Sequence, residues 1–210
     1  PKVQSALVSI NPSNGEVLAL VGGYNFQNSQ FNRAFQAKPQ LGSNFKPFLY
    51  AAAFENGFNP ASIIIDSPLV FEDENLEEIW RPRNASGKFY GPTRLREALV
   101  QSRNVVSIKL LQEVSIKSTK NSLEKYGFFK DELPNDLSLA LGSYGASPLK
   151  NAEMFSIFAN GGKKITSYFI DKIVLPSGDE INFSKKKKSK TGDYLSQWFG
   201  KEFVENEEFI

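Results

Sequence analysis

A serine precedes a lysine by three residues in QLGSNFKPFLY, residues 40–50. On a helix, Ser43 and Lys46 would share one face, one turn apart. Pro47 lacks an N–H and is tolerated only in a helix's first turn, so the helix is predicted to begin at about Ser43 or Asn44. A serine at this positive helix end gains from the dipole as it becomes an alkoxide, and a desolvated lysine can accept its proton. The spacing therefore predicts an activated nucleophile.

The same residues also fit an ordinary helix start. Serine is a common N-cap, and a lysine can lay its apolar stem along a surface. The Ser-x-x-Lys spacing is also found at three other places in the chain: Ser122/Lys125, Ser147/Lys150 and Ser184/Lys187. The catalytic interpretation therefore needs support from other residues.

The composition restricts the chemistry that a serine could perform. The 210 residues include no histidine and no cysteine, which excludes a Ser-His-Asp triad, a Cys-His pair and an ordinary zinc site. A nucleophilic serine would need lysine as its base, and this chemistry requires no metal or organic cofactor. The formal net charge of +2, from 25 basic and 23 acidic residues, gives no sign of a nucleic-acid partner.

A second polar group, Ser102 and Asn104, lies just ahead of an apolar helical run in ALVQSRNVVSIKLL, residues 98–111. By itself, Ser-x-Asn at the start of a helix is usually a cap. Beside Ser43 and Lys46, the second hydroxyl could relay a proton to a leaving group. The asparagine amide could hold both the lysine and a substrate carbonyl.

A third candidate is the triplet Lys190-Thr191-Gly192. A lysine beside a small residue on a strand could bind a substrate carboxylate. This lysine, however, ends the basic run KKKKSK, and a charge run is usually a solvated linker. The residues alone leave both interpretations open.

Hydrophobic periodicity and turn residues predict the elements that must position these groups. β-Rich runs at 3–10 and 16–22 flank a turn signal and predict an antiparallel hairpin. Residues 165–183 predict a second hairpin around the turn residues Pro176 to Asp179. Helical periodicity predicts four further helices, at 95–99, 105–114, 119–126 and 148–160.

Two segments are predicted to be loops, and the chain is expected to be part of a longer protein. Residues 23–42 are typical of a long surface loop, and residues 58–92, with four prolines, of a loop-rich segment with one short strand at 68–71. No apolar run approaches the ~20 residues of a membrane span. The first residues continue a strand pattern and lack signal-peptide features.

Four stretches of the sequence resemble the transpeptidase domain of class A penicillin-binding proteins, the bifunctional peptidoglycan synthases. They are VQSALVSINPSNGEVLALVGG, FNRAFQAKPQLGSNFKPFLYAAA, the segment from WRPRN to YGPTRLREALVQSRNVV, and LALGSYGASPLKNAEMFSIFANGG. Ser-x-x-Lys combined with Ser-x-Asn and Lys-Thr-Gly is typical of penicillin-binding proteins and class A β-lactamases. The resemblance implies an α+β, β-lactamase/transpeptidase-like fold in which an antiparallel sheet packs with helices.

The resemblance also implies a reaction. Ser43 would be the acyl-enzyme nucleophile, Lys46 its general base, and Ser102 and Asn104 the second motif. Ser43 would attack the D-Ala-D-Ala bond of a peptidoglycan stem peptide, release D-alanine, and pass the acyl group to an amine on a neighbouring strand. β-Lactam antibiotics would inhibit it, and the Ser43 N–H would form half of the oxyanion hole. The parent protein would be anchored in the bacterial cytoplasmic membrane through a preceding segment, with this domain on the outer, periplasmic face.

The third motif departs from the family pattern. Only 27 residues separate Gly162 from Lys190, and Asp193 follows the triplet where the family has further Thr or Ser residues. We therefore expect 1–183 to be the transpeptidase domain, 184–210 to be a basic linker with an acidic tail, and some strands of the sheet to be missing. The alternative is an internally shortened domain that uses Lys190-Thr191-Gly192 to bind substrate.

Two other functions are compatible with these residues. A D,D-carboxypeptidase or β-lactamase would share the serine nucleophile and differ in how water reaches the acyl-enzyme, although no segment resembles the glutamate loop of class A β-lactamases. A catalytically incomplete domain could instead serve as a binding or scaffold module. Turnover of a β-lactam would indicate a hydrolase, and a folded chain that forms no adduct would indicate a scaffold.

Overall fold

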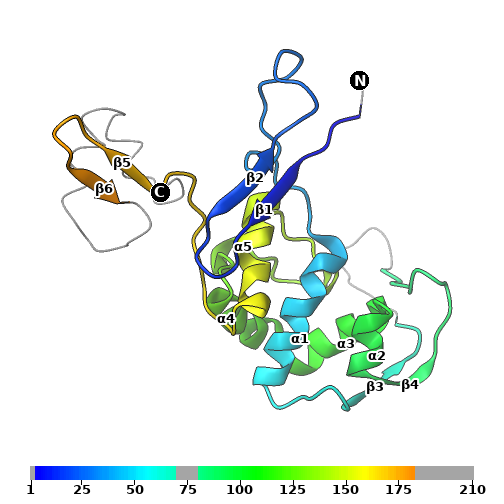
Figure 1. The fold of residues 1–210 in the computed structure, drawn as a ribbon. Coiled ribbons are helices and arrows are strands. Elements are labelled where there is room, and N and C mark those ends of the chain that lie inside the picture. Colours follow the sequence, from blue (N-terminus) through cyan, green and yellow to red (C-terminus); the bar gives the residue numbers. More distant parts are fainter. Residues whose placement is uncertain (1–2, 70–79, 183–210) are drawn as a thin grey trace. The chain divides into compact units, whose positions relative to one another are not determined.

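The computed structural model describes residues 3–69 and 80–182, and the chain divides into two compact units. Unit 1 is formed by Pro1–Phe35 together with Pro148–Ile210, and unit 2 by Gln36–Ser147. Figure 1 follows the chain through both units. The residues of the first two predicted motifs all fall in unit 2.

Helix α1 (Lys46–Glu55) packs against the other α-helices of unit 2. Its sequence, KPFLYAAAFE, is apolar on most sides, as expected of a buried helix, and Phe48, Leu49 and Ala52 are fully enclosed. The helices around it are α2 (Leu95–Val100), α3 (Asn104–Val114) and α4 (Ile116–Lys125) (Figure 1). They confirm the helices predicted at 95–99, 105–114 and 119–126.

A cluster of aromatic rings fixes the start of α1. The ring of Phe128 packs edge-on against Phe45, with centroids 5.5 Å apart, and against Phe48, with centroids 5.0 Å apart. Tyr144 adds a third contact to Phe128, at 5.3 Å. Burying each such ring contributes about 1.5–3 kcal/mol. Because Phe45 follows Ser43 by two residues, this cluster also holds the backbone that carries the predicted nucleophile.

The chain approaches α1 through a 3-10 turn, η1 (Gly42–Phe45), that lies against a second segment of unit 2. Main-chain hydrogen bonds join this segment to η1: Leu41 N–H donates to Tyr144 O, and Gly42 N–H donates to Gly142 O. Gly142 ends the 3-10 helix η3 (Leu137–Leu141) with a left-handed φ of 74°. A Cβ at this glycine would lie 2.0 Å from the carbonyl oxygen of Gly42, a distance that no real contact allows.

Gly142→Ala should therefore destabilise the fold and displace the turn that carries Ser43. We expect the free energy of unfolding to fall by about 2–4 kcal/mol, because backbone strain at positive φ adds to the clash with Gly42. Urea denaturation measures the change. Gly57→Ala is the matched control, since Gly57 also has positive φ but nothing lies within 4 Å of the position that its Cβ would take. Equal losses in the two variants would contradict the role of the clash.

Strand β3 (Ile63–Asp66) pairs with β4 (Gly91–Arg94) in an antiparallel register that joins Ile63 to Arg94 and Asp66 to Gly91. The prediction of a short strand at 68–71 was wrong for residues 68 and 69, which lie outside any strand. Residues 70 and 71 lie outside the described residues. Three successive isoleucines favour the earlier segment, whereas a proline at 68 lacks a donor for a ladder.

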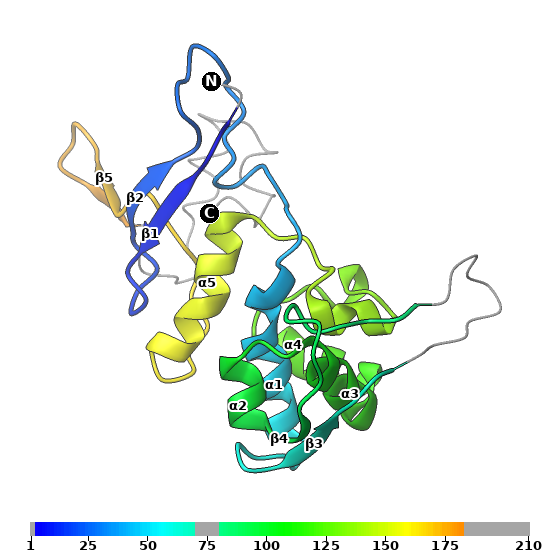
Figure 2. The same ribbon diagram turned by 90° about the vertical axis from the view of Figure 1, so that its right-hand side faces the viewer.

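In its described part, unit 1 contains the two predicted hairpins and helix α5 (Figure 2). The first hairpin pairs β1 (Leu7–Ile10) with β2 (Val17–Val21), and the second pairs β5 (Lys172–Val174) with β6 (Glu180–Asn182). Helix α5 (Pro148–Ala159) packs on β1 and ends before the glycines of ANGG, as predicted.

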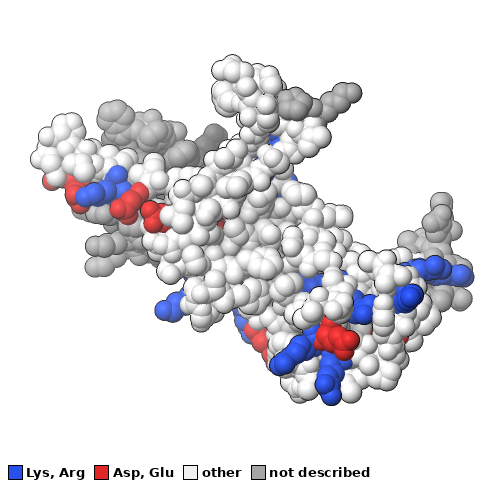
Figure 3. Space-filling model, turned by 45° about the vertical axis from the view of Figure 1, so that its right-hand side comes forward, with Lys and Arg blue, Asp and Glu red and all other residues white. Residues whose placement is uncertain are grey.

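The described strands form three antiparallel pairs beside helices, so the predicted α+β class is confirmed. Among the residues that the structure describes, no helix is both long and apolar enough to cross a bilayer. Figure 3 shows basic and acidic side chains next to one another on the face drawn. This mixture agrees with the near balance of charge in the sequence.

Candidate active site

Ser43 and Lys46 lie at the join between η1 and α1, one in solvent and the other in the core. The Ser43 residue is exposed, and Lys46 is only 1% exposed at the first position of α1. Pro47 follows in the first turn, where its missing N–H has no partner to lose. The α-helix begins at Lys46, two to three residues later than predicted, because the residues that bear the serine form the 3-10 turn η1. A reachable hydroxyl beside a buried amine is the arrangement that nucleophilic catalysis requires.

The ammonium of Lys46 is held by the second predicted motif. Its Nζ donates hydrogen bonds to Ser102 O at 2.7 Å, Ser102 Oγ at 2.9 Å and Asn104 Oδ1 at 2.7 Å. Burial lowers the pKa of Lys46 from 10.5 to about 8. Roughly a tenth of the molecules would then carry neutral Lys46 at pH 7. A lysine in this state can serve as a proton acceptor.

The hydroxyl of Ser102 connects the lysine to the exposed serine. Ser102 Oγ donates to Ser43 Oγ at 3.1 Å while accepting from Lys46 Nζ. Ser102 has a left-handed φ of 51°, which is unusual for a residue with a side chain. This strained backbone lets the carbonyl and hydroxyl of one residue face the same ammonium. Within the described residues, the hydrogen-bonded route from Lys46 to Ser43 passes through Ser102.

Asn104 orients its amide by a main-chain contact on its other side. Its Nδ2 donates to Arg83 O at 3.0 Å, which turns Oδ1 toward Lys46. Helix α3 begins at Asn104, and the residue at its N-cap, Arg103, makes no side-chain cap bond. The alternative that Ser102 and Asn104 simply cap this helix is therefore not what the structure shows.

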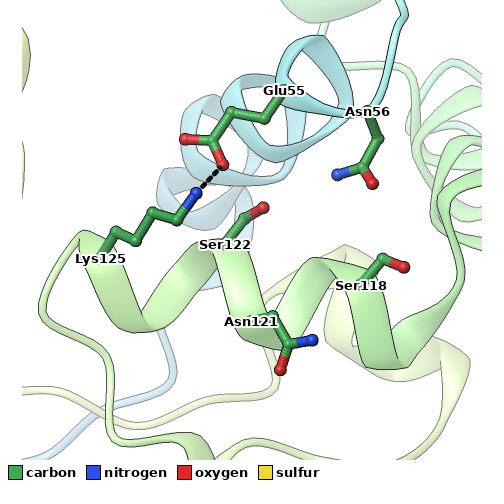
Figure 4. A pocket seen from close by; sticks show the side chains of 6 residues that line it. All are labelled: Glu55, Asn56, Ser118, Asn121, Ser122 and Lys125. Atoms are coloured by element: carbon green, nitrogen blue, oxygen red, sulfur yellow. Dashed lines mark hydrogen bonds and ion pairs between the residues drawn. The ribbon is translucent and has the colours of Figure 1, made fainter.

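In the described residues, the lysines of the other Ser-x-x-Lys pairs form ion pairs with glutamates. Lys125 bonds to Glu55 at 2.8 Å in a hollow of about 430 Å³ between the end of α1 and helix α4, and does not bond to Ser122 (Figure 4). Lys150 is ion-paired with Glu153. The pair Ser184/Lys187 lies outside the described residues, as does the third predicted motif, Lys190-Thr191-Gly192.

Sequence reasoning identified the four polar side chains that meet here and missed the main-chain acceptor behind them. The carbonyl of Arg83 has no side-chain signature that could reveal its role. The only sequence feature that drew attention to Arg83 was its position in WRPRN, which belongs to one of the stretches that resemble the family.

Comparison with known proteins shows the family. The family model of the penicillin binding protein transpeptidase domain matches residues 5–197. The chain belongs to this family. Penicillin-binding protein 1A of Pseudomonas aeruginosa is 50% identical over 181 residues, which are 86% of this chain and 22% of that protein.

Solved structures of penicillin-binding proteins share the fold of this transpeptidase domain. The crystal structure of penicillin-binding protein 1A from Haemophilus influenzae matches with a TM-score of 0.79 and 40% identity. The match covers 85% of this chain and 26% of that protein's chain. The PonA1 protein from Mycobacterium tuberculosis in complex with penicillin V has a TM-score of 0.73 and 27% identity, and covers 85% of this chain and 49% of its own. The chain thus spans about a fifth of the curated relative and a quarter to a half of these two structures.

Proposed function

We propose that this domain acts as a serine D,D-transpeptidase in peptidoglycan synthesis. The observation that carries the proposal is the continuous hydrogen-bonded path from Ser43 Oγ through Ser102 Oγ to Lys46 Nζ. It joins an exposed nucleophile to a buried amine of lowered pKa in a chain that contains no histidine. Membership of the penicillin-binding transpeptidase family supports the same assignment.

Acylation begins with Lys46 in its neutral form. A neutral amine has two N–H donors, which the acceptors Ser102 O and Asn104 Oδ1 occupy, so its lone pair faces the hydroxyl of Ser102. As Ser43 Oγ attacks the carbonyl carbon of the penultimate D-alanine, its proton passes to Ser102 Oγ, and the proton of Ser102 passes to Lys46. The Ser43 N–H would supply one donor to the oxyanion.

Collapse of the tetrahedral intermediate breaks the amide bond. The proton held by Lys46 returns through Ser102 to the leaving nitrogen, and D-alanine departs. An amine on a neighbouring stem peptide then attacks the ester of Ser43 and gives up a proton by the same route. The products are the cross-linking amide and the free serine, so the site returns to its starting protonation.

A β-lactam would react by the first half of this sequence. Its ring amide replaces the D-Ala-D-Ala bond: the former amide carbonyl becomes the ester of Ser43, and the leaving nitrogen, which takes the proton, stays joined to that ester through the rest of the opened ring. Because the leaving group remains tethered, an incoming amine is obstructed and the adduct persists. We therefore also propose peptidoglycan stem peptides and β-lactam antibiotics as ligands of the site, and the outer face of the bacterial cytoplasmic membrane as the location of the parent protein.

The test is the intact mass of the purified chain after incubation with benzylpenicillin, with circular dichroism to establish that it is folded. A single adduct with the mass of the antibiotic, mapped to the peptide that contains Ser43, is the expected result. A folded chain that remains unmodified would contradict the proposal and indicate a binding or scaffold module. An adduct that is rapidly hydrolysed, with turnover of the antibiotic, would indicate a hydrolase.

A further inference from the structure

A buried amide lies directly behind the second motif. Asn84, the last residue of WRPRN, is 5% exposed. Its Nδ2 donates to both carboxylate oxygens of Asp66, at 3.0 and 2.9 Å, and to Lys88 O at 2.9 Å. Its Oδ1 accepts from Val105 N–H at 3.2 Å. One side chain therefore ties together three segments that are distant in sequence.

Asn84 and the preceding residue, Arg83, together form a two-point clamp on the start of α3. Arg83 O accepts from the side chain of Asn104, and Asn84 Oδ1 accepts from the N–H of Val105, the residue that follows. Arg83 and Asn84 thus bind Asn104 and Val105, the first two residues of α3. The position of Arg83 O, which sets the amide of Asn104, depends on where Asn84 is fixed.

Asp66 determines which way the amide of Asn84 faces. It is 1% exposed at the end of β3, and both of its carboxylate oxygens accept hydrogen bonds from Nδ2 of Asn84. A flipped amide would place its oxygen against this carboxylate and its NH₂ against the N–H of Val105. Both contacts would be repulsive, so the pair allows one orientation.

We propose that Asn84, oriented by Asp66, is a positioning residue for acylation: it fixes Arg83 O, which turns the amide oxygen of Asn104 toward Lys46. Asn84 touches neither Ser43 nor Lys46, so it acts through Asn104 and is not itself catalytic. The inference rests on the proposed function of the site. Because a catalytic group displaced by about 1 Å can cost on the order of 100-fold in rate, the loss of this clamp should be visible in the chemical step.

Two readouts test the clamp in the whole chain. The first is the side-chain amide signal of Asn104 in protein labelled with ¹⁵N-asparagine, assigned by its absence in Asn104→Ala. The second is the acylation rate constant at saturating benzylpenicillin. In Asn84→Ala we expect the Asn104 signal to move toward the position of a solvated amide. The rate constant should fall about 10- to 100-fold.

Two further variants separate positioning from general destabilisation. Leu123→Ala removes a buried side chain of α4 and should lower stability without moving the Asn104 signal. The double variant Asn84→Asp/Asp66→Asn exchanges the two partners, restores an acceptor for Val105 N–H, and should recover part of the rate. If Asn84→Ala does not fold, Asp66→Asn carries the same test, because it keeps Asn84 but replaces one of the two acceptor oxygens that orient it.

An Asn84→Ala protein with an unchanged Asn104 signal and a wild-type rate constant would overturn the inference. Equal effects of Leu123→Ala and Asn84→Ala would also overturn it, since the effect would then follow from stability alone. A parent chain that forms no adduct would instead refute the proposed function. In that case the Asn104 signal still shows whether Asn84 positions the amide.

Discussion

Ser43→Ala should abolish the benzylpenicillin adduct while leaving the fold intact. The residue is exposed, and its hydroxyl accepts one hydrogen bond, from Ser102. Losing that bond should change the free energy of unfolding by no more than about 1 kcal/mol. The chemical loss is complete because no other oxygen of η1 or α1 is joined through Ser102 to Lys46. Intact mass and thermal unfolding of the parent and the variant measure both effects.

The matched control for this prediction is Ser122→Ala. Ser122 has the same spacing to a lysine, but its Lys125 is bonded to Glu55. This variant should form the adduct at the rate of the parent. A stable adduct on Ser43→Ala would mean that another serine is the nucleophile, and peptide mapping would identify it.

Lys46→Met should lower the rate of acylation by about 10²- to 10⁴-fold, the usual contribution of a positioned general base. In the parent, burial places the pKa of Lys46 at about 8, and only the neutral form can accept a proton. The rate should therefore rise about tenfold per pH unit below this pKa and level off above it. Lys46→Arg should be as slow as Lys46→Met, because a guanidinium stays protonated.

Acylation rates measured from below to above this pKa, by quenching and mass spectrometry, test the assignment. Lys125→Met is the control: it removes an exposed, ion-paired lysine and should keep both the rate and the pH profile of the parent. A parent rate that does not change with pH, or an unchanged profile in Lys46→Met, would show that Lys46 is not the base. Loss of folding in Lys46→Met would be detected by circular dichroism, and Lys46→Arg would then decide.

The sequence by itself determined the local parts of the site. Ser43 and Lys46 are three residues apart, and Pro47 can only stand in the first turn of a helix, so the geometry of a few residues placed Ser43 in the turn that leads into α1. Because the chain contains no histidine, its composition alone pointed to lysine as the base. The hairpins and the helices of both units also followed from local periodicity and turn residues.

Only the tertiary structure decided how these groups are connected. Ser102 is 56 positions from Lys46 in the sequence, and its strained backbone and bridging hydroxyl arise from packing, not from its neighbours. The same holds for the burial that lowers the pKa of Lys46 and for the pairing of Asn84 with Asp66. The burial and orientation of a side chain depend on segments that are distant in the sequence and meet in the core. The spacing of residues gives information only about the one segment in which they lie.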